Sequence, residues 1–203
     1  RRRVGQIAVA KLWPLTREVE ALKKNMDDLP DHDAVLADVI AQTPVITGFV
    51  LTGDPNLPRL PVNKASFAYG GDDPLPHLFG FRGVVANLEI LTENASGNGS
   101  FNLVAERDGI VRRVPMFLRL DGQSSPYPSL TAEVLRVIQG VRTYIIKTTG
   151  ASGEIGYGGV QLGLNNIKIG NYELPTGPNG RMWIHFTGNV PERRIPAWKV
   201  FSP

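Results

Sequence analysis

The chain has no cysteine among its 203 residues. This absence excludes disulfide bonds, zinc sites built from thiolates and a cysteine nucleophile, and it suits an exported bacterial domain as well as a cytosolic one. The chain also lacks any run of about 18 apolar residues, and its first residues show no recognisable signal peptide. We therefore expect any membrane anchor of a longer parent protein to lie outside these residues.

Positive charge is only in small excess. The formal net charge is +3 and the sequence pI is 9.3. Arg1, Arg2 and Arg3 account for the whole excess, because without them 19 basic residues face 19 acidic ones. With no basic stripe and no interleaved aromatic residues, the sequence predicts no nucleic-acid partner.

A hydrophobic content of 42% is enough to form a core. Its patterning predicts a single α/β domain over residues 1–203, with a mixed central sheet and helices packed against it. Before residue 100 the expected elements are a strand at 6–10, a helix at 14–24, a helix at 31–42 that Asp31 or Asp33 caps, a strand at 44–51, a long surface excursion at 53–82 in which only 66–70 has strand character, and a short helix at 87–95.

The strongest local pattern is a β-hairpin followed by a helix. Residues 101–106 and 110–120 read as strands that flank Arg107, Asp108 and Gly109, and Asp-Gly between two such runs is typical of a hairpin turn. The helix after it begins near Pro128 and ends at Gly140. Its expected apolar stripe, which would pack on the hairpin, consists of Leu130, Val134, Val137 and Ile138.

The adjacent arginines of this hairpin are the main candidate site residues. Alternation along a strand places Arg112 in the row of Ile110 and Val114, and Arg113 in the opposite row, so we expect Arg112 to point inward. A buried guanidinium needs an anion, and Asp108, Glu133 or an acidic ligand could supply it. We therefore expect Arg112→Ala to lower the free energy of unfolding by roughly 3 kcal/mol, and Arg113→Ala to lower it by at most about 0.5 kcal/mol.

Catalytic and metal-site patterns are weak. The acidic residues before the helix at 31–42 are read as helix-capping residues, and the same interpretation is preferred to metal binding for Asp72, Asp73 and His77. The glycines of 153–163 lack the Lys-Ser/Thr of a phosphate-binding loop. There is no Gly-x-Ser-x-Gly motif, and His185 is expected to be a buried histidine within a strand. We therefore expect no catalytic residue, no metal and no cofactor.

Residues 99–140 resemble the signature of the type-2 CHASE domain, an extracytoplasmic sensory module of bacterial adenylate cyclases and histidine kinases. The matching positions, in order and spacing, are Gly99, Asn102, Asp108, Gly109, Arg112, Arg113, Pro115, Tyr127, Pro128, Ser129 and Leu130. Weaker similarity extends to residues 13–19, 31–48 and 180–201. The sequence departs from the family pattern at two places. The strand that the family usually has near Asn25 is missing, and so is the glycine-rich region that usually follows the position of Pro203. We therefore expect the domain to be incomplete at these places.

The resemblance implies an extracytoplasmic domain that is anchored through segments outside this chain and controls a cytoplasmic cyclase or kinase. It further implies a small molecule or protein as stimulus and a homodimeric parent receptor, and it assigns no specific ligand. Two alternatives remain open from the residues alone: a small-molecule or carbohydrate binding domain without signalling output, and a metal-dependent hydrolase based on the aspartate clusters.

Overall fold

The computed structural model of the chain describes residues 19–20, 30–56, 59–151 and 162–201. The strand predicted at 6–10 lies outside the described residues. So does the helix predicted at 14–24, apart from Val19 and Glu20, which are helical. The glycine-rich segment 153–163 also lies outside them except for its last two residues.

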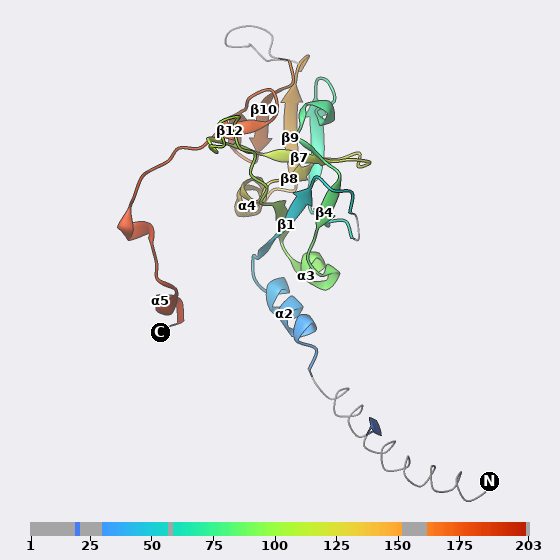
Figure 1. Cartoon of the computed structure of the whole chain (residues 1–203), viewed down its shortest axis with the longest axis vertical. Coiled ribbons are helices and arrows are strands. Elements are labelled where there is room, and N and C mark those ends of the chain that lie inside the picture. Colours follow the sequence, from blue (N-terminus) through green and yellow to red (C-terminus); the bar gives the residue numbers. More distant parts are fainter. Residues whose placement is uncertain (1–18, 21–29, 57–58, 152–161, 202–203) are drawn as a thin grey trace, which may run out of the picture.

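Short helices and strands alternate along the described chain (Figure 1). The first half contains α2 (His32–Ala41), β1 (Ile46–Thr52), β2 (Ser66–Gly70), the 3-10 turn η1 (Leu75–His77), β3 (Gly80–Phe81), β4 (Gly83–Val85), α3 (Glu89–Asn94) and β5 (Gly97–Ser100). The second half contains β6 (Arg113–Pro115), β7 (Phe117–Leu120), β8 (Tyr127–Pro128), α4 (Leu130–Ile138), β9 (Thr143–Thr148), β10 (Leu164–Ile169), β11 (Tyr172–Pro175), β12 (Arg181–Trp183), η2 (Pro191–Arg193) and α5 (Ala197–Phe201).

The strands pair in four small sheets, of which the first three include both parallel and antiparallel pairs. Their orders are β4-β1-β5, β11-β10-β9-β2, β3-β7-β8 and β12-β6. β5 runs parallel to β1, and β2 runs parallel to β9, whereas the β10–β11, β7–β8 and β12–β6 pairs are antiparallel. The predicted α/β class with mixed pairing is therefore confirmed, although the pairing is divided among several sheets.

Two hydrophobic clusters form the core, and β7 contributes to both. Phe117 belongs to the cluster around Tyr144 and Ile167, whereas Leu118 and Leu120 belong to the cluster around Phe49. All three β7 side chains are fully buried. This division follows from the two-residue period of a strand, which places neighbouring side chains on opposite faces. β7 therefore holds the two halves of the body together.

The predicted hairpin is only partly formed. Its turn is present: the N–H of Gly109 donates to the carbonyl of Glu106 at 2.9 Å, and Gly109 has a φ of 80°, which favours glycine. Residues 101–106, however, form no strand, so the prediction for them is wrong. The partner of β6 is the distant strand β12, and the hairpin that precedes α4 is the one between β7 and β8.

The long predicted strand at 110–120 is divided at Met116. A bend there ends β6 and begins β7, and the two strands join different sheets. The N–H of Met116 donates to the carbonyl of Gly180, and its carbonyl accepts from the N–H of Ser129. Because the strand is interrupted, side-chain alternation cannot be carried from Leu118 back to Arg112.

The excursion predicted at 53–82 is more closely integrated than expected. β2 is present where strand character was predicted, and it forms the edge of the four-stranded sheet. β3 also pairs with β7, and Leu78 is buried in the core. The segment is therefore part of the body and not a surface loop throughout.

The helices begin where the sequence predicts, but the buried face of α4 differs from the predicted one. The carboxylate of Asp31 accepts from the N–H groups of Asp33 and Ala34, and the hydroxyl of Ser129 accepts from the N–H of Ala132. In α4 the predicted apolar stripe is wrong, because Val134 and Ile138 are exposed. The face that packs inward carries Ala132, Glu133 and Arg136.

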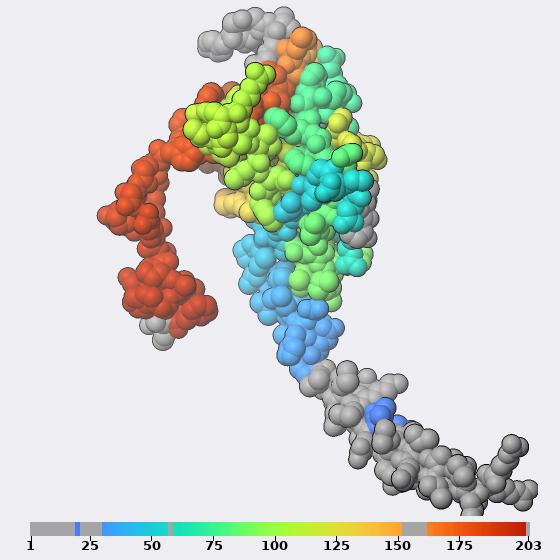
Figure 2. All heavy atoms as spheres, viewed as in Figure 1, coloured from blue at the N-terminus to red at the C-terminus, as the bar shows by residue number. Residues whose placement is uncertain are grey.

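After β12 the chain leaves the body. Figures 1 and 2 show residues 184–201, which include η2 and α5, as an arm that extends away from the packed sheets. α2 lies at the other side, against α3. Among the described residues no helix is long and apolar enough to cross a membrane.

Gly99 is expected to be essential to the packing of β5 against α4. A Cβ at this position would lie 2.5 Å from the Cα of Leu130, so the helix backbone would have to move. We expect Gly99→Ala to lower the free energy of unfolding by about 1–3 kcal/mol. Gly53→Ala is the matched control, since a Cβ there meets nothing within 4 Å, and it should change stability by less than about 0.5 kcal/mol. Equal stability of the two variants in urea unfolding would contradict this packing.

Candidate functional site

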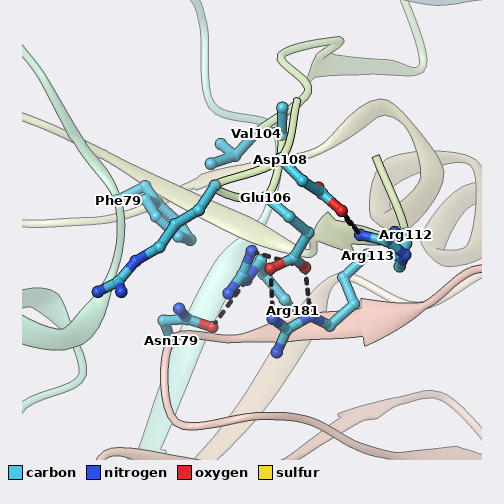
Figure 3. Close-up of a pocket in the computed structure, with 10 residues that line it drawn as sticks. Phe79, Val104, Glu106, Asp108, Arg112, Arg113, Asn179 and Arg181 are labelled. Atoms are coloured by element: carbon cyan, nitrogen blue, oxygen red, sulfur yellow. Dashed lines mark hydrogen bonds and ion pairs between the residues drawn. The ribbon is translucent and has the colours of Figure 1, made fainter. Parts of the chain in front are cut away.

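A charged pocket surrounds the turn at residues 106–109. Its volume is about 650 Å³, within the usual range for small-molecule sites. The turn contributes one wall, and β6 and β12 contribute the opposite side (Figure 3). The lining residues are Phe79, Val104, Ala105, Glu106, Arg107, Asp108, Arg112, Arg113, Asn179 and Arg181.

Glu106 lies at the centre of this pocket and is shared by two arginines (Figure 3). Arg113 donates from Nε to Oε1 at 2.7 Å and from Nη2 to Oε2 at 2.8 Å. Arg181 donates from Nη1 to the same Oε1 at 3.3 Å and from Nε to Oδ1 of Asn179 at 3.2 Å. The bidentate pair with Arg113 is the stronger contact, because two parallel charge-assisted bonds fix its geometry.

Aromatic rings support both guanidinium groups. Arg113 lies over the ring of Trp183, with 5.1 Å to the centroid, and Arg181 lies over the ring of Phe79 at 5.2 Å. Such contacts hold a planar guanidinium in place while its N–H edge remains available. The pairing of β6 with β12 sets Trp183 opposite Arg113 and thereby orders the cluster.

Arg112 takes the outer position, which reverses the predicted arrangement. Its side chain is 40% exposed and pairs with Asp108 at 2.8 Å, whereas the side chain of Arg113 is 25% exposed. The prediction that Arg112 points inward is therefore wrong, because the strand begins only at Arg113 and the bend at Met116 shifts the alternation. The large loss of stability expected for Arg112→Ala is therefore no longer expected, since exposed ion pairs contribute little to the free energy of unfolding.

The surroundings of Glu106 and Asp108 stabilise the ionised forms of both carboxyl groups. Hydrogen bonds from Arg113, with the charges of the nearby arginines, hold the pKa of Glu106 below its ordinary value. The N–H of Ile110, followed by the guanidinium of Arg112, lowers the pKa of Asp108. Both carboxylates are therefore ionised at neutral pH. Four arginines against two carboxylates leave an excess of two positive charges in the pocket.

Glu133 lies in a different part of the molecule and pairs with neither Arg112 nor Arg113. Its side chain is 1% exposed, and its carboxylate receives Arg136 from Nε at 2.9 Å and from Nη2 at 2.7 Å. Tyr144 donates its hydroxyl to the same carboxylate at 2.6 Å, and the N–H of Asn98 donates at 3.2 Å. Burial and the adjacent Glu133 charge raise the pKa of Tyr144 far above its ordinary value, so this hydroxyl remains a donor.

Arg136 completes the buried group. Its remaining donors reach the carbonyls of Val141, at 3.0 Å, and Ser96, at 2.9 Å. A buried ion pair is tolerated when its hydrogen bonds are satisfied in this way. We conclude that Glu133 ties α4 to β5 and β9 and has a structural position.

Several signature residues hold the backbone in place. The amide of Asn102 donates from Nδ2 to the carbonyl of Leu51 and accepts on Oδ1 from its N–H, both at 2.7 Å, so it continues the pairing of β1 beyond β5. The ring of Tyr127 packs edge-on against Phe49, with centroids 5.7 Å apart. Pro115, Pro128 and Ser129 end β6, end β8 and cap α4, respectively.

The other candidate residues do not gather into a site. Asp73 accepts from the N–H of Leu75, as a turn-capping residue does. His185 follows β12 and is exposed, so the prediction of a buried histidine within a strand is wrong. In the described parts of the chain no three His, Asp or Glu side chains are close enough together to hold a metal ion.

Sequence reasoning missed four polar residues of the pocket: Glu106, Arg107, Asn179 and Arg181. Glu106 was assigned to a strand that does not form, and Arg181 reaches the pocket only through the pairing of β12 with β6. The one signal in the sequence was the position of Glu106, directly before the turn and seven residues from Arg113.

Comparison with known proteins supports the resemblance seen in the signature. The family model of the CHASE2 domain matches residues 11–203, which is nearly the whole chain. The same comparison found no curated protein and no solved structure that matches this chain.

The buried pair of α4 leads to a stability prediction. Glu133→Ala strands the guanidinium of Arg136 in the interior and should lower the free energy of unfolding by about 3–5 kcal/mol. Glu173→Ala is the control: Glu173 pairs with Lys147 at 3.0 Å but is 52% exposed, and its loss should cost less than about 1 kcal/mol. Chemical denaturation of both variants measures the difference, and similar losses would show that the buried pair contributes no more than a surface pair.

Proposed function

The chain belongs to the CHASE2 domain family of extracellular sensory domains, and from that membership we propose that it receives the stimulus of a bacterial membrane receptor. The cytoplasmic part of this receptor is a nucleotide cyclase or a histidine kinase. Membrane segments outside these residues carry the response to it.

The distribution of the signature residues supports this proposal most directly. Gly99, Asn102 and Tyr127 are built into the packing of β1, β5 and α4. Asp108, Arg112 and Arg113, in contrast, line the charged pocket. A domain that only held a shape would not need a set of partly exposed, paired charges at one place, whereas a domain that binds a stimulus does.

The mechanism is a two-state change in the extracytoplasmic part. A stimulus that binds one conformation better shifts the equilibrium toward it, by at most the difference in binding free energy between the two states. The shared carboxylate of Glu106 suits such a change, because its bond to Arg181 is the longer one and can be exchanged without loss of the bidentate pair with Arg113.

A homodimeric receptor is part of the proposal, and the surface of α2 supports it. Val35, Leu36 and Val39 are each about half exposed on this helix. Their spacing matches the apolar face of a helix that packs against another helix. A second copy of the chain would cover this face.

A binding domain without signalling output remains the second candidate, because the pocket alone does not distinguish the two. The metal-hydrolase alternative has no support from the described residues, which hold no cluster of possible metal ligands.

The test uses the full-length receptor in intact cells. Because this chain has no cysteine, Ser124→Cys at an exposed turn gives one defined labelling position once cysteines elsewhere in the receptor are replaced. A membrane-impermeant maleimide should label the Ser124→Cys receptor in cells that have not been permeabilised. Labelling that requires permeabilised cells would contradict the extracytoplasmic location.

The output is measured on the same cells. Cyclic-nucleotide synthesis or autophosphorylation, normalised to the labelled receptor, should change in the Glu133→Ala receptor, whose sensory domain is destabilised, and not in the Glu173→Ala receptor. If both variants match the parent receptor, or if neither activity is present, the domain does not control such an enzyme.

A further inference from the structure

We propose that the pocket around Glu106 is a binding site for a small dianion that carries carboxylate or phosphate groups. This inference rests on the proposed sensory function for its biological role, whereas its chemistry rests on the pocket itself. Four arginines line the pocket and form what we call the arginine cluster: Arg107, Arg112, Arg113 and Arg181.

The pocket has a net positive charge. The cluster outnumbers Glu106 and Asp108 by two charges, and the pocket lining contains no other ionisable side chain. An excess of two positive charges is matched by an anion of charge −2. Guanidinium groups stay protonated at all physiological pH values, so this preference does not depend on pH.

Three arginines of the cluster also have N–H groups that no described residue accepts. Arg107 is exposed, lines the pocket and has no ion-pair or hydrogen-bond partner in the described part of the chain. Arg181 uses Nε and Nη1 for Asn179 and Glu106, and its Nη2 donates to no described residue. Arg112 is 40% exposed and bonds to Asp108 through Nη1. Each of these side chains therefore has at least one N–H group that no described residue accepts.

The arginine cluster already binds one carboxylate, that of Glu106. Glu106 accepts three hydrogen bonds from two guanidinium groups that aromatic rings keep in position. A carboxylate or phosphate of a ligand offers the same acceptor geometry. Because Arg181 binds Glu106 at 3.3 Å, the longest of these bonds, the ligand would draw Arg181 away from Glu106 before it disturbs Arg113.

The size of the pocket suits a small molecule. About 650 Å³ accommodates an organic acid or a phosphomonoester. The ring of Phe79 lines the pocket as well, so an apolar part of the ligand between or beside its acid groups would find a surface to contact.

Binding is measured by calorimetric titration of the full chain at constant ionic strength. The probes are succinate and inorganic phosphate, titrated at a pH above the second pKa of each so that both are dianions, and acetate as a monoanion. Succinate, phosphate or both should bind saturably, and acetate should bind at least about tenfold more weakly because it satisfies one donor set instead of two. A response to succinate alone assigns a dicarboxylate, and a response to phosphate alone assigns a phosphate-bearing ligand.

Variants link the binding to this pocket. Arg181→Ala and Arg107→Ala should each weaken it by about tenfold, since each removes a charge-assisted contact. Arg107 makes no hydrogen bond or ion pair with the described residues, so its variant remains informative if Arg181→Ala fails to fold. Glu106→Gln should tighten binding, because it removes the competing charge. Arg59→Ala, a surface arginine outside the pocket with a 3.8 Å contact to Glu89, should leave the affinity unchanged.

Three results would overturn the inference: no saturable binding of either dianion at millimolar concentration, equal weakening by Arg59→Ala and Arg107→Ala, or weaker binding in Glu106→Gln. Failure of the sensory function is distinguishable from these. If dianions bind but receptor output does not respond, the site stands and the sensory role fails. If the receptor responds to a stimulus equally with Arg107→Ala and Arg181→Ala, the sensory role stands and this site fails.

Discussion

The buried ion pair between Glu133 and Arg136 is the interaction on which the architecture depends. Its carboxylate joins α4 to β9 through Tyr144 and to β5 through the N–H of Asn98. The start of α4 is in turn fixed by Ser129, whose N–H donates to Met116, and Met116 donates to Gly180 beside β12. A continuous set of hydrogen bonds thus connects the interior charge pair with the two strands that carry Arg113 and Arg181.

This arrangement separates the charges that stabilise the fold from those of the proposed binding site. The charges of the interior are fully paired and out of reach of solvent, so their loss is costly. The charges of the pocket are more exposed: the side chains of Arg181, Glu106 and Arg113 are 11–25% exposed, and those of Arg112 and Asp108 are 40–50% exposed. The outer Arg112–Asp108 pair contributes little to stability, so it can be exchanged for bonds to a ligand at little cost to the fold. β6 and β12 are short, three-residue strands, but the pairing between them fixes the spacing of the two arginines that share Glu106.

Local features were predictable from the sequence and long-range partners were not. Asp31 and Ser129 cap helices, and Gly109 makes a turn, because each of these effects depends on residues within three positions. The inward residue of the Arg112–Arg113 pair was assigned wrongly, since alternation holds only within an unbroken strand and Met116 interrupts it. The buried face of α4 was also missed, because an apolar stripe was expected to face the core and a satisfied Glu133–Arg136 pair does so instead. For the pocket, Arg112 and Arg113 were found, but Arg181 lies 68 positions after Arg113 and no local pattern joins them.

Hydrogen exchange of the backbone amides tests the central claim, that the pocket around Glu106 binds an anion while the buried network stays unchanged. The chain is compared with and without succinate or phosphate at equal ionic strength. The account predicts slower exchange at residues 106–116 and 181–184, where Gly109, Met116 and Ile184 donate their N–H groups around the pocket, and no change in α4 or β9. Unchanged exchange at the pocket segments, or slowing confined to α4 and β9, would contradict it.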